Sequence, residues 1–233
     1  MTASSPERTI CKGANAVDSN LLLVYATVSN LLSSESLLQE YLSSVLITGS
    51  SHTGKTTLAR RIGEALGWTV VSTDTLARHP GRPWPEVRQP VAEYYSSLTD
   101  ATLYWFLRVH HENMWPGLDR AIDDAQMAAL PTIFEGSALR PGYVASRMSV
   151  SNVGICLYAD ALFLRNRMRS ESQYDSFDQK RRAIIDKFID RSLRDNTEIL
   201  QAARTLGLIC VEANDAGAIN QLSADLIRRA AQR

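Results

Sequence analysis

The segment that most restricts the fold of this chain is residues 45–57, VLITGSSHTGKTT. It begins with apolar residues typical of a buried strand, continues through a loop bounded by glycines, and leads into an amphipathic helical pattern over 58–66. The loop matches G-x-x-x-x-G-K-[ST], the pattern of a phosphate-binding loop between a strand and a helix. The segment therefore predicts an α/β fold that binds the phosphates of a nucleotide.

The residue types in this loop suit that chemistry. Backbone N–H groups must turn inward to hold phosphate oxygens, and side chains at Gly49 or Gly54 would obstruct that path. The N-terminus of the next helix points at the same anion. Lys55 adds a positive charge at the outer phosphates, and the Thr56 hydroxyl can ligate Mg²⁺. We expect ATP or GTP with Mg²⁺, bound by Gly49, Ser50, Ser51, His52, Thr53, Gly54, Lys55, Thr56 and Thr57.

Short apolar runs alternate with helical patterns over residues 44–233, which we interpret as one domain. This alternation predicts a three-layer α/β fold, a five-stranded parallel sheet flanked by helices, and ligands at the carboxyl ends of the strands. The expected strands are 45–48, 68–72, 132–134, 153–158 and 208–211. The expected helices are 55–66, two within 91–128 that separate near Pro116-Gly117, a long one capped by Asp175 or Ser176 and ended by Gly207, and a last one capped by Asp215.

Residues 1–43 precede the first strand as a polar tail and a helical extension. Apolar residues recur at helical spacing over 20–42, which predicts a helix packed on the flank of the domain or, alternatively, a homodimer surface. The apolar run at 21–26 starts too late for a signal peptide, and no run is long enough to span a membrane. Three scattered cysteines are too few for a disulfide framework, so we expect a cytoplasmic protein.

The charge balance argues against nucleic acid as a partner. The chain has 25 basic and 25 acidic residues and a formal net charge of zero, so no global basic field attracts a polyanion. Arginines at 78, 82 and 88 form a local basic patch, which keeps a polynucleotide 5′-kinase open as an alternative.

Asp74 follows the second expected strand, at the same edge of the sheet as the phosphate-binding loop. A carboxylate there can accept a proton from an attacking hydroxyl or orient Mg²⁺ through water. Residues 75–90 are rich in Pro and Arg and predict a loop. Arg78 and Arg82 in this loop suit a substrate that carries phosphate or carboxylate, whereas His79 before Pro80 is more typical of a turn.

Glu135 ends the third expected strand and precedes Gly136, which permits close approach of a ligand. No Asp precedes Glu135, so the acid pair of many motor ATPases is absent from this position of the sequence. We expect Glu135 to bind substrate hydroxyls or to act in the second shell of Mg²⁺.

Three arginines follow the fourth expected strand, at positions 165, 167 and 169, within a candidate lid over about 161–175. Alternate spacing cannot put all three on one helix face. We expect Arg165 and Arg169 to stabilise the transferring phosphoryl group and Arg167 to contact the nucleotide. His110-His111-Glu112 lacks the ligand set of a zinc site, and we expect these residues to form a wall of the acceptor pocket.

These motifs together resemble P-loop small-molecule kinases over about residues 44–213. The nearest patterns are the zeta-toxin and chloramphenicol-phosphotransferase group and 2-phosphoglycerate-kinase-like proteins, in which a strand ending Glu-Gly is followed by a Leu and a Pro-Gly, as in residues 135–142, EGSALRPG. The resemblance implies that Asp74 deprotonates an acceptor hydroxyl, that Glu135 contacts the acceptor, and that the arginines at 165–169 contact ATP. The N-terminal extension is not part of the pattern.

The sequence therefore predicts an ATP- and Mg²⁺-dependent kinase that phosphorylates a hydroxyl of a small-molecule acceptor. Lys55 and Asp74 would be catalytic, and Asp74, Arg78, Arg82 and Glu135 would bind the acceptor. The main alternative is a nucleotide-dependent binding switch with little catalysis. A sugar, nucleotide sugar, glycerate, antibiotic or nucleoside would each suit the acceptor site.

Overall fold

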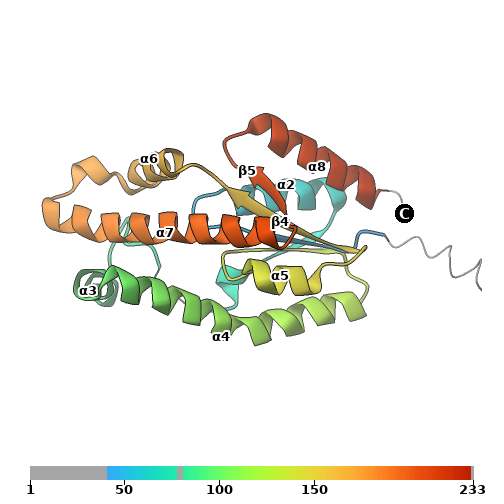
Figure 1. The fold of residues 1–233 in the computed structure, drawn as a ribbon, viewed down its shortest axis with the longest axis horizontal. Helices are drawn as coiled ribbons and strands as arrows, with labels where there is room; N and C mark the ends of the chain where they lie inside the picture. The colour runs from blue at the N-terminus through green and yellow to red at the C-terminus, as the bar shows by residue number, and fades with distance from the viewer. Residues whose placement is uncertain (1–40, 78–80, 232–233) are drawn as a thin grey trace, which may run out of the picture. The chain divides into compact units, whose positions relative to one another are not determined.

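The structure, a computed structural model, describes residues 41–77 and 81–231. Most of the expected N-terminal extension, the expected acceptor-binding residue Arg78 and the expected turn at His79 lie outside these ranges. Within the described part, five parallel strands form one sheet in the order β2-β3-β1-β4-β5 (Figure 1). The strands are β1 (Ser44–Thr48), β2 (Thr69–Ser72), β3 (Thr132–Glu135), β4 (Asn152–Tyr158) and β5 (Ile209–Glu212).

The parallel α/β fold class is confirmed, and each expected strand is found with its ends shifted by no more than one residue at either side. β1 is the central strand, paired with β3 on one side and β4 on the other. Its register with β3 sets Ile47 beside Glu135. The loop after β1 and the last residue of β3 are therefore neighbours at the carboxyl edge of the sheet, where ligands bind in such folds.

Alternate residues of β1 enter two different cores, because successive side chains of a strand point to opposite faces. Val45 and Ile47 pack against α2 (Lys55–Leu66) and α8 (Ala216–Ala230). Leu46 enters a second core on the opposite face of the sheet. The residues of this second core include side chains of other strands and of α4 (Asp100–Met127), α5 (Pro141–Arg147) and α7 (Gln179–Thr205). The expected three layers are thus formed by helices covering both faces of the sheet.

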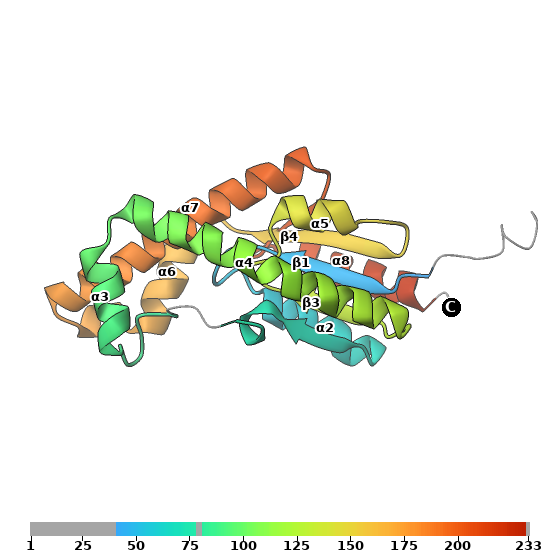
Figure 2. The same cartoon turned by 90° about the horizontal axis from the view of Figure 1, so that it is seen from below.

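A third core lies beyond the carboxyl ends of the strands. It contains side chains of α3 (Gln89–Ser97), α6 (Ala161–Ser172) and the first turns of α4 and α7, together with Trp84. Both views place α3, α6 and the first half of α7 past the end of the sheet (Figures 1 and 2). These helices therefore form a wall around the space in front of the loop that follows β1.

The break within residues 91–128 is not where Pro116-Gly117 predicts it. The first helix ends at Ser97, and Thr99 caps the next one by accepting a hydrogen bond from the N–H of Thr102. α4 then continues through Pro116 to Met127. A proline inside a helix costs about 3 kcal/mol. Met114, Leu118 and Ile122 are buried on one face of α4, on both sides of the proline. Burial of each such side chain stabilises the folded state by about 1.5–3 kcal/mol, and together these contributions outweigh the cost of the proline.

The long helical pattern after β4 also divides differently from the prediction. Its capping residue is Asp178, whose carboxylate accepts from the N–H of Arg181, rather than Asp175 or Ser176, which lie in a short 3₁₀ turn. α7 ends at Thr205, and Gly207 follows with a left-handed φ of 76°. Asp215 caps α8 as expected.

The helix α5 was not predicted, because its seven residues are too few for a periodic pattern. None of the helices in the described ranges has the length and apolar character to cross a bilayer.

Candidate active site

A cavity of about 260 Å³ opens at the carboxyl edge of the sheet. It is bounded by the loop after β1, by η1 (Thr73–Thr75), by the end of β3 and by the helices α4, α6 and α7. The cavity brings together most of the site residues that the sequence predicts. Those that line it are Ser51, His52, Gly54, Lys55, Thr56, Thr57, Asp74, Arg82, His110, His111, Glu135, Gly136 and Arg167.

Two glycines shape the loop, for different reasons. Gly49 has a φ of 149°, and a Cβ there would lie 2.3 Å from the backbone oxygen of Leu157 in β4. Gly54 has a φ of 83° and stands at the N-terminus of α2, where no side chain caps the free N–H groups. The start of α2 therefore presents unsatisfied donors to the cavity. Ser50 and Thr53 are buried behind the loop surface, where the Thr53 hydroxyl donates to the Ser50 carbonyl at 3.0 Å.

Lys55 carries a buried ammonium group at the phosphate-binding loop. Its side chain donates to the carbonyl of Ser50 at 2.6 Å, and the residue is 9% exposed. Burial lowers the pKa of Lys55, and the nearby charges of Glu135 and Asp74 oppose that shift. No carboxylate lies within ion-pair distance of Lys55 in the described residues. Phosphate oxygens are suitable partners for such a lysine.

Thr56 and Glu135 meet beside Lys55. The Thr56 hydroxyl donates a 3.0 Å hydrogen bond to Glu135 Oε1. Glu135 is 2% exposed, so it does not face bulk solvent as a charged group at a strand end usually does. A hydroxyl and a carboxylate next to bound phosphates form an oxygen donor set that suits Mg²⁺. The residues present therefore fit the predicted metal.

Gly136 has a packing role that the sequence did not reveal. Its φ is 150°, and a Cβ there would lie 1.8 Å from the hydroxyl oxygen of Thr73. Gly136 lines the cavity, but the space left by its missing side chain admits Thr73 rather than a ligand. This close approach fixes the start of η1 against the end of β3, and Asp74 is the next residue along the chain.

Asp74 lines the cavity at its exposed side and makes no side-chain hydrogen bond or ion pair within the described residues. It shares the cavity with Lys55 and Glu135, and its charge acts on the lysine. A carboxylate at this position can act as a proton acceptor. Arg82, by contrast, forms an ion pair with Glu171 of α6, although both line the cavity.

The three arginines of α6 divide between two sides of the helix. Arg165 and Arg169 are four residues apart and face α7, where they pair with Asp190 at 3.1 Å and Asp186 at 3.2 Å. Arg167 lies on the other side and lines the cavity, with Nη1 4.0 Å from the position that a Cβ of Gly54 would take. The structure thus brings Arg167 to the phosphate-binding loop and leaves Arg165 and Arg169 outside the cavity.

Glu171 links the loop to α6 and was not anticipated. Its carboxylate lies 2.9 Å from Nε2 of His52, whose side chain is 2% exposed, and it also accepts from Nε1 of Trp84 at 3.4 Å. Burial and the charge of Arg82 lower the pKa of His52 to about 4, against the opposing effect of Glu171. His52 is therefore neutral near pH 7. No motif in the sequence indicates this contact.

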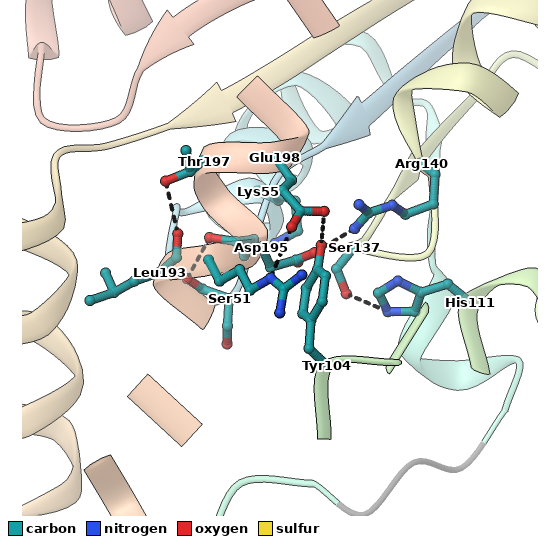
Figure 3. Close-up of polar contacts among 12 residues, drawn as sticks. Ser51, Lys55, Tyr104, His111, Ser137, Arg140, Leu193, Asp195, Thr197 and Glu198 are labelled. Atoms are coloured by element: carbon teal, nitrogen blue, oxygen red, sulfur yellow. Dashed lines mark hydrogen bonds and ion pairs between the residues drawn. The ribbon is translucent and has the colours of Figure 1, made fainter. Parts of the chain in front are cut away.

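One stretch of α7 also contributes side chains that the sequence interpretation missed: Phe188, Arg191, Ser192 and Asp195 line the cavity. The apolar stripe of α7 becomes polar after Ile189, and this change was the available signal. Arg140 forms an ion pair with the buried carboxylate of Asp195. Figure 3 shows Arg140 pointing toward Asp195 and the Tyr104 hydroxyl pointing toward Glu198.

His110 and His111 lie on α4 and line the cavity, whereas Glu112, expected beside them in a wall of the acceptor pocket, does not. His111 is 3% exposed, and its Nε2 lies 3.3 Å from the hydroxyl of Ser137 (Figure 3). Its burial and this contact make it part of the structural wall around the cavity.

No protein family model matches the chain, and no curated protein matches it. Solved structures with a similar arrangement include a gluconokinase from Sinorhizobium meliloti 1021, with 18% identity, a TM-score of 0.48, and coverage of 83% of this chain and 96% of that one. A shikimate kinase from Acinetobacter baumannii has 15% identity and a TM-score of 0.40, with coverage of 81% of this chain and 93% of that one. A sugar kinase from Janibacter sp. HTCC2649 has 21% identity and a TM-score of 0.41, with coverage of 81% of this chain and 92% of that one.

These three similar structures are small-molecule kinases by name. None of them is a zeta toxin, a chloramphenicol phosphotransferase or a 2-phosphoglycerate kinase, so that finer resemblance stays a prediction. At these identities and scores the similarities carry no conclusion about the reaction or the substrate of this chain.

Proposed function

We propose that this chain is an ATP- and Mg²⁺-dependent kinase that phosphorylates a hydroxyl group of a small molecule. One observation carries the proposal: a single cavity contains a phosphate-binding loop with its lysine and, beside it, the carboxylate of Asp74, which has no partner among the described residues. A donor site and a proton acceptor in one small space are what phosphoryl transfer to a hydroxyl requires. The volume of about 260 Å³ favours a small acceptor over a macromolecule.

The residues around the loop would hold the triphosphate. The N–H groups at the start of α2 and the ammonium group of Lys55 would bind phosphate oxygens. Thr56 would ligate Mg²⁺, with Glu135 behind it, and the metal would neutralise charge on the β- and γ-phosphates.

The transfer itself needs one proton acceptor and correct alignment. The acceptor oxygen forms a bond to the γ-phosphorus, and the bond from that phosphorus to the bridging oxygen of ADP breaks. The hydroxyl proton passes to Asp74. Charge on the moving phosphoryl group is balanced by Lys55 and by Arg167, the arginine of α6 that lies over the loop. Most of the rate enhancement then comes from positioning and electrostatics.

The test is ADP release measured over a panel of hydroxyl-bearing metabolites with Mg²⁺·ATP, with product detection by mass spectrometry. The Lys55→Ala protein is the blank. Asp225→Asn, an exposed carboxylate of α8 outside the cavity, is the matched control for carboxylate changes. We expect one or more panel members to stimulate ADP release and to gain one phosphoryl group. Tight nucleotide binding without stimulation by any panel member would favour the binding switch instead.

A further inference from the structure

Arg191 is a cation in the cavity that the proposed transfer does not use. It lies on α7, on the stretch of that helix that lines the cavity. Lys55 and Arg167 account for the positive charge on the nucleotide side. A further guanidinium group on α7 suits a separate anionic ligand, because an uncompensated charge in a partly closed space is costly.

Arg191 is held by aromatic groups rather than by an opposite charge. Its guanidinium carbon lies 4.8 Å from the ring centre of Phe188 and 5.6 Å from that of Tyr95. Nη1 donates to the Tyr95 hydroxyl at 3.0 Å, and that hydroxyl donates to the carbonyl of Gly81 at 3.1 Å. These contacts fix the direction of the guanidinium group.

The partner that Arg191 does have is neutral. Burial raises the pKa of Tyr95 to about 12, so the phenol carries no charge at ordinary pH. Nε of Arg191 is buried and lacks a hydrogen-bond partner in the part of the chain that the structure describes. The positive charge is therefore oriented but not compensated.

Three other arginines in or near the cavity differ in this respect, whereas Arg167, the remaining arginine of the lining, is already assigned to the phosphates. Arg82 pairs with Glu171, and Arg140 pairs with Asp195. Arg194, one turn further along α7, pairs with Glu198 at 2.9 Å. Within the described ranges Arg191 forms no ion pair with a carboxylate. Its forked donors match the geometry of a carboxylate or phosphate group.

We infer that the acceptor carries an oxyanion, either a carboxylate or a phosphate, and that Arg191 binds it while Asp74 receives the proton of the acceptor hydroxyl. This inference rests on the proposed kinase function, because it assigns the substrate class of the same cavity. Arg191 is then the residue that determines specificity for a small hydroxylated anion over a neutral polyol.

The kinetic test compares matched pairs of acceptors that differ in charge: glycerate with glycerol, and glucose 6-phosphate with glucose. We expect the wild-type protein to favour the anionic member of a pair. Arg191→Gln should raise KM for that anion by roughly 10- to 100-fold, as expected for lost hydrogen bonds to a charged group, and leave the KM for ATP unchanged. Arg191→Lys should give a smaller increase. Arg194→Gln, on the same helix but outside the cavity lining, should change neither value.

A binding measurement separates this inference from the kinase proposal. The phosphate-binding loop is first saturated with Mg²⁺·ADP, so that an added anion cannot report on Lys55. The Nε–H resonance of Arg191, assigned as the one missing from Arg191→Gln, is then followed during titration with glycerate, glucose 6-phosphate and inorganic phosphate. We expect a saturable shift with at least one anion and none with glycerol or glucose.

The outcomes differ for the two proposals. Saturable binding at Arg191 without phosphoryl transfer to any acceptor supports the anion site and contradicts the kinase. Transfer to neutral acceptors at rates that Arg191→Gln does not change overturns the inference and leaves the kinase standing. Absence of a shift at Arg191 with every anion also overturns the inference, and a two-state unfolding curve for each variant shows that a lost signal is not lost folding.

Discussion

The hydroxyl of Thr56 donates a 3.0 Å hydrogen bond to Oε1 of Glu135, and this contact joins the first turn of α2 to the end of β3. The two oxygens come from segments 79 positions apart in the chain and meet because β1 and β3 are paired in the sheet. Their meeting point lies beside the ammonium group of Lys55, whose pKa the Glu135 charge raises against the effect of burial. The proposed Mg²⁺ site lies at this meeting point.

Replacing Glu135 tests that assignment. Glu135→Gln keeps the size and the hydrogen-bond acceptor for Thr56 but removes the charge, so we expect weaker Mg²⁺ use and turnover lower by ~10-fold or more. The measurement is turnover as a function of Mg²⁺ concentration. A thermal-unfolding comparison of ADP with Mg²⁺·ADP supplies a second readout, because a bound metal stabilises the folded state. Identical Mg²⁺ titrations for variant and wild type would remove Glu135 from the metal site.

The arginines of α6 should not contribute equally. Arg167 lies over the phosphate-binding loop, whereas Arg165 and Arg169 pair with carboxylates of α7. We expect Arg167→Gln to lower kcat by ~10²-fold, as for a lost contact to transition-state charge. Arg165→Gln and Arg169→Gln are matched controls from the same helix and should lower kcat by less than ~10-fold. Equal losses for all three arginines would indicate that α6 reorients during the reaction.

Asp195 should contribute to stability as well as to the cavity wall. Its carboxylate side chain is 3% exposed and pairs with Arg140, so Asp195→Ala leaves a largely buried guanidinium group without its partner. We expect a loss of about 3–5 kcal/mol in the free energy of unfolding, measured by urea denaturation. The control is Asp190→Ala, which removes the carboxylate of an exposed pair and should cost about 1 kcal/mol or less.

His52 should make stability depend on pH in a defined window. Its pKa is lowered from 6.5 to about 4, first by burial and then by the charge of Arg82. Between these two values the unfolded chain binds a proton that the folded protein does not, so stability falls as pH decreases from 6.5 toward 4. We expect His52→Gln to flatten this part of the profile in urea unfolding experiments. A variant profile parallel to that of the wild type would contradict the assigned shift.

The local elements and the nucleotide side of the cavity could be predicted because their signals are short-range. The glycine-bounded loop, the apolar strands and the cap at Asp215 are each encoded within a few neighbouring residues. Position at the end of a parallel strand also sufficed to place Asp74 and Glu135 at one edge of the sheet.

The missed features depend on contacts between distant segments. Pro116 looks like a helix end when only its neighbours are considered, and burial of Leu118 and Ile122 overrides it. The division of the arginines on α6 depends on where the carboxylates of α7 lie. The contact between His52 and Glu171 joins residues that are 119 positions apart in the chain (171 − 52). The role proposed for Arg191 could not be predicted because it depends on the contacts of its guanidinium group with the rings of Tyr95 and Phe188.

The most direct test of the central claim is a single-turnover measurement of phosphoryl transfer from Mg²⁺·ATP in the wild-type and Asp74→Asn proteins, using an acceptor found in the metabolite panel. We expect Asp74→Asn to bind Mg²⁺·ATP as tightly as the wild type but to transfer the phosphoryl group at least ~10²-fold more slowly. A transfer rate equal to that of the wild type would contradict Asp74 as the proton acceptor and, with it, the proposed reaction in this cavity.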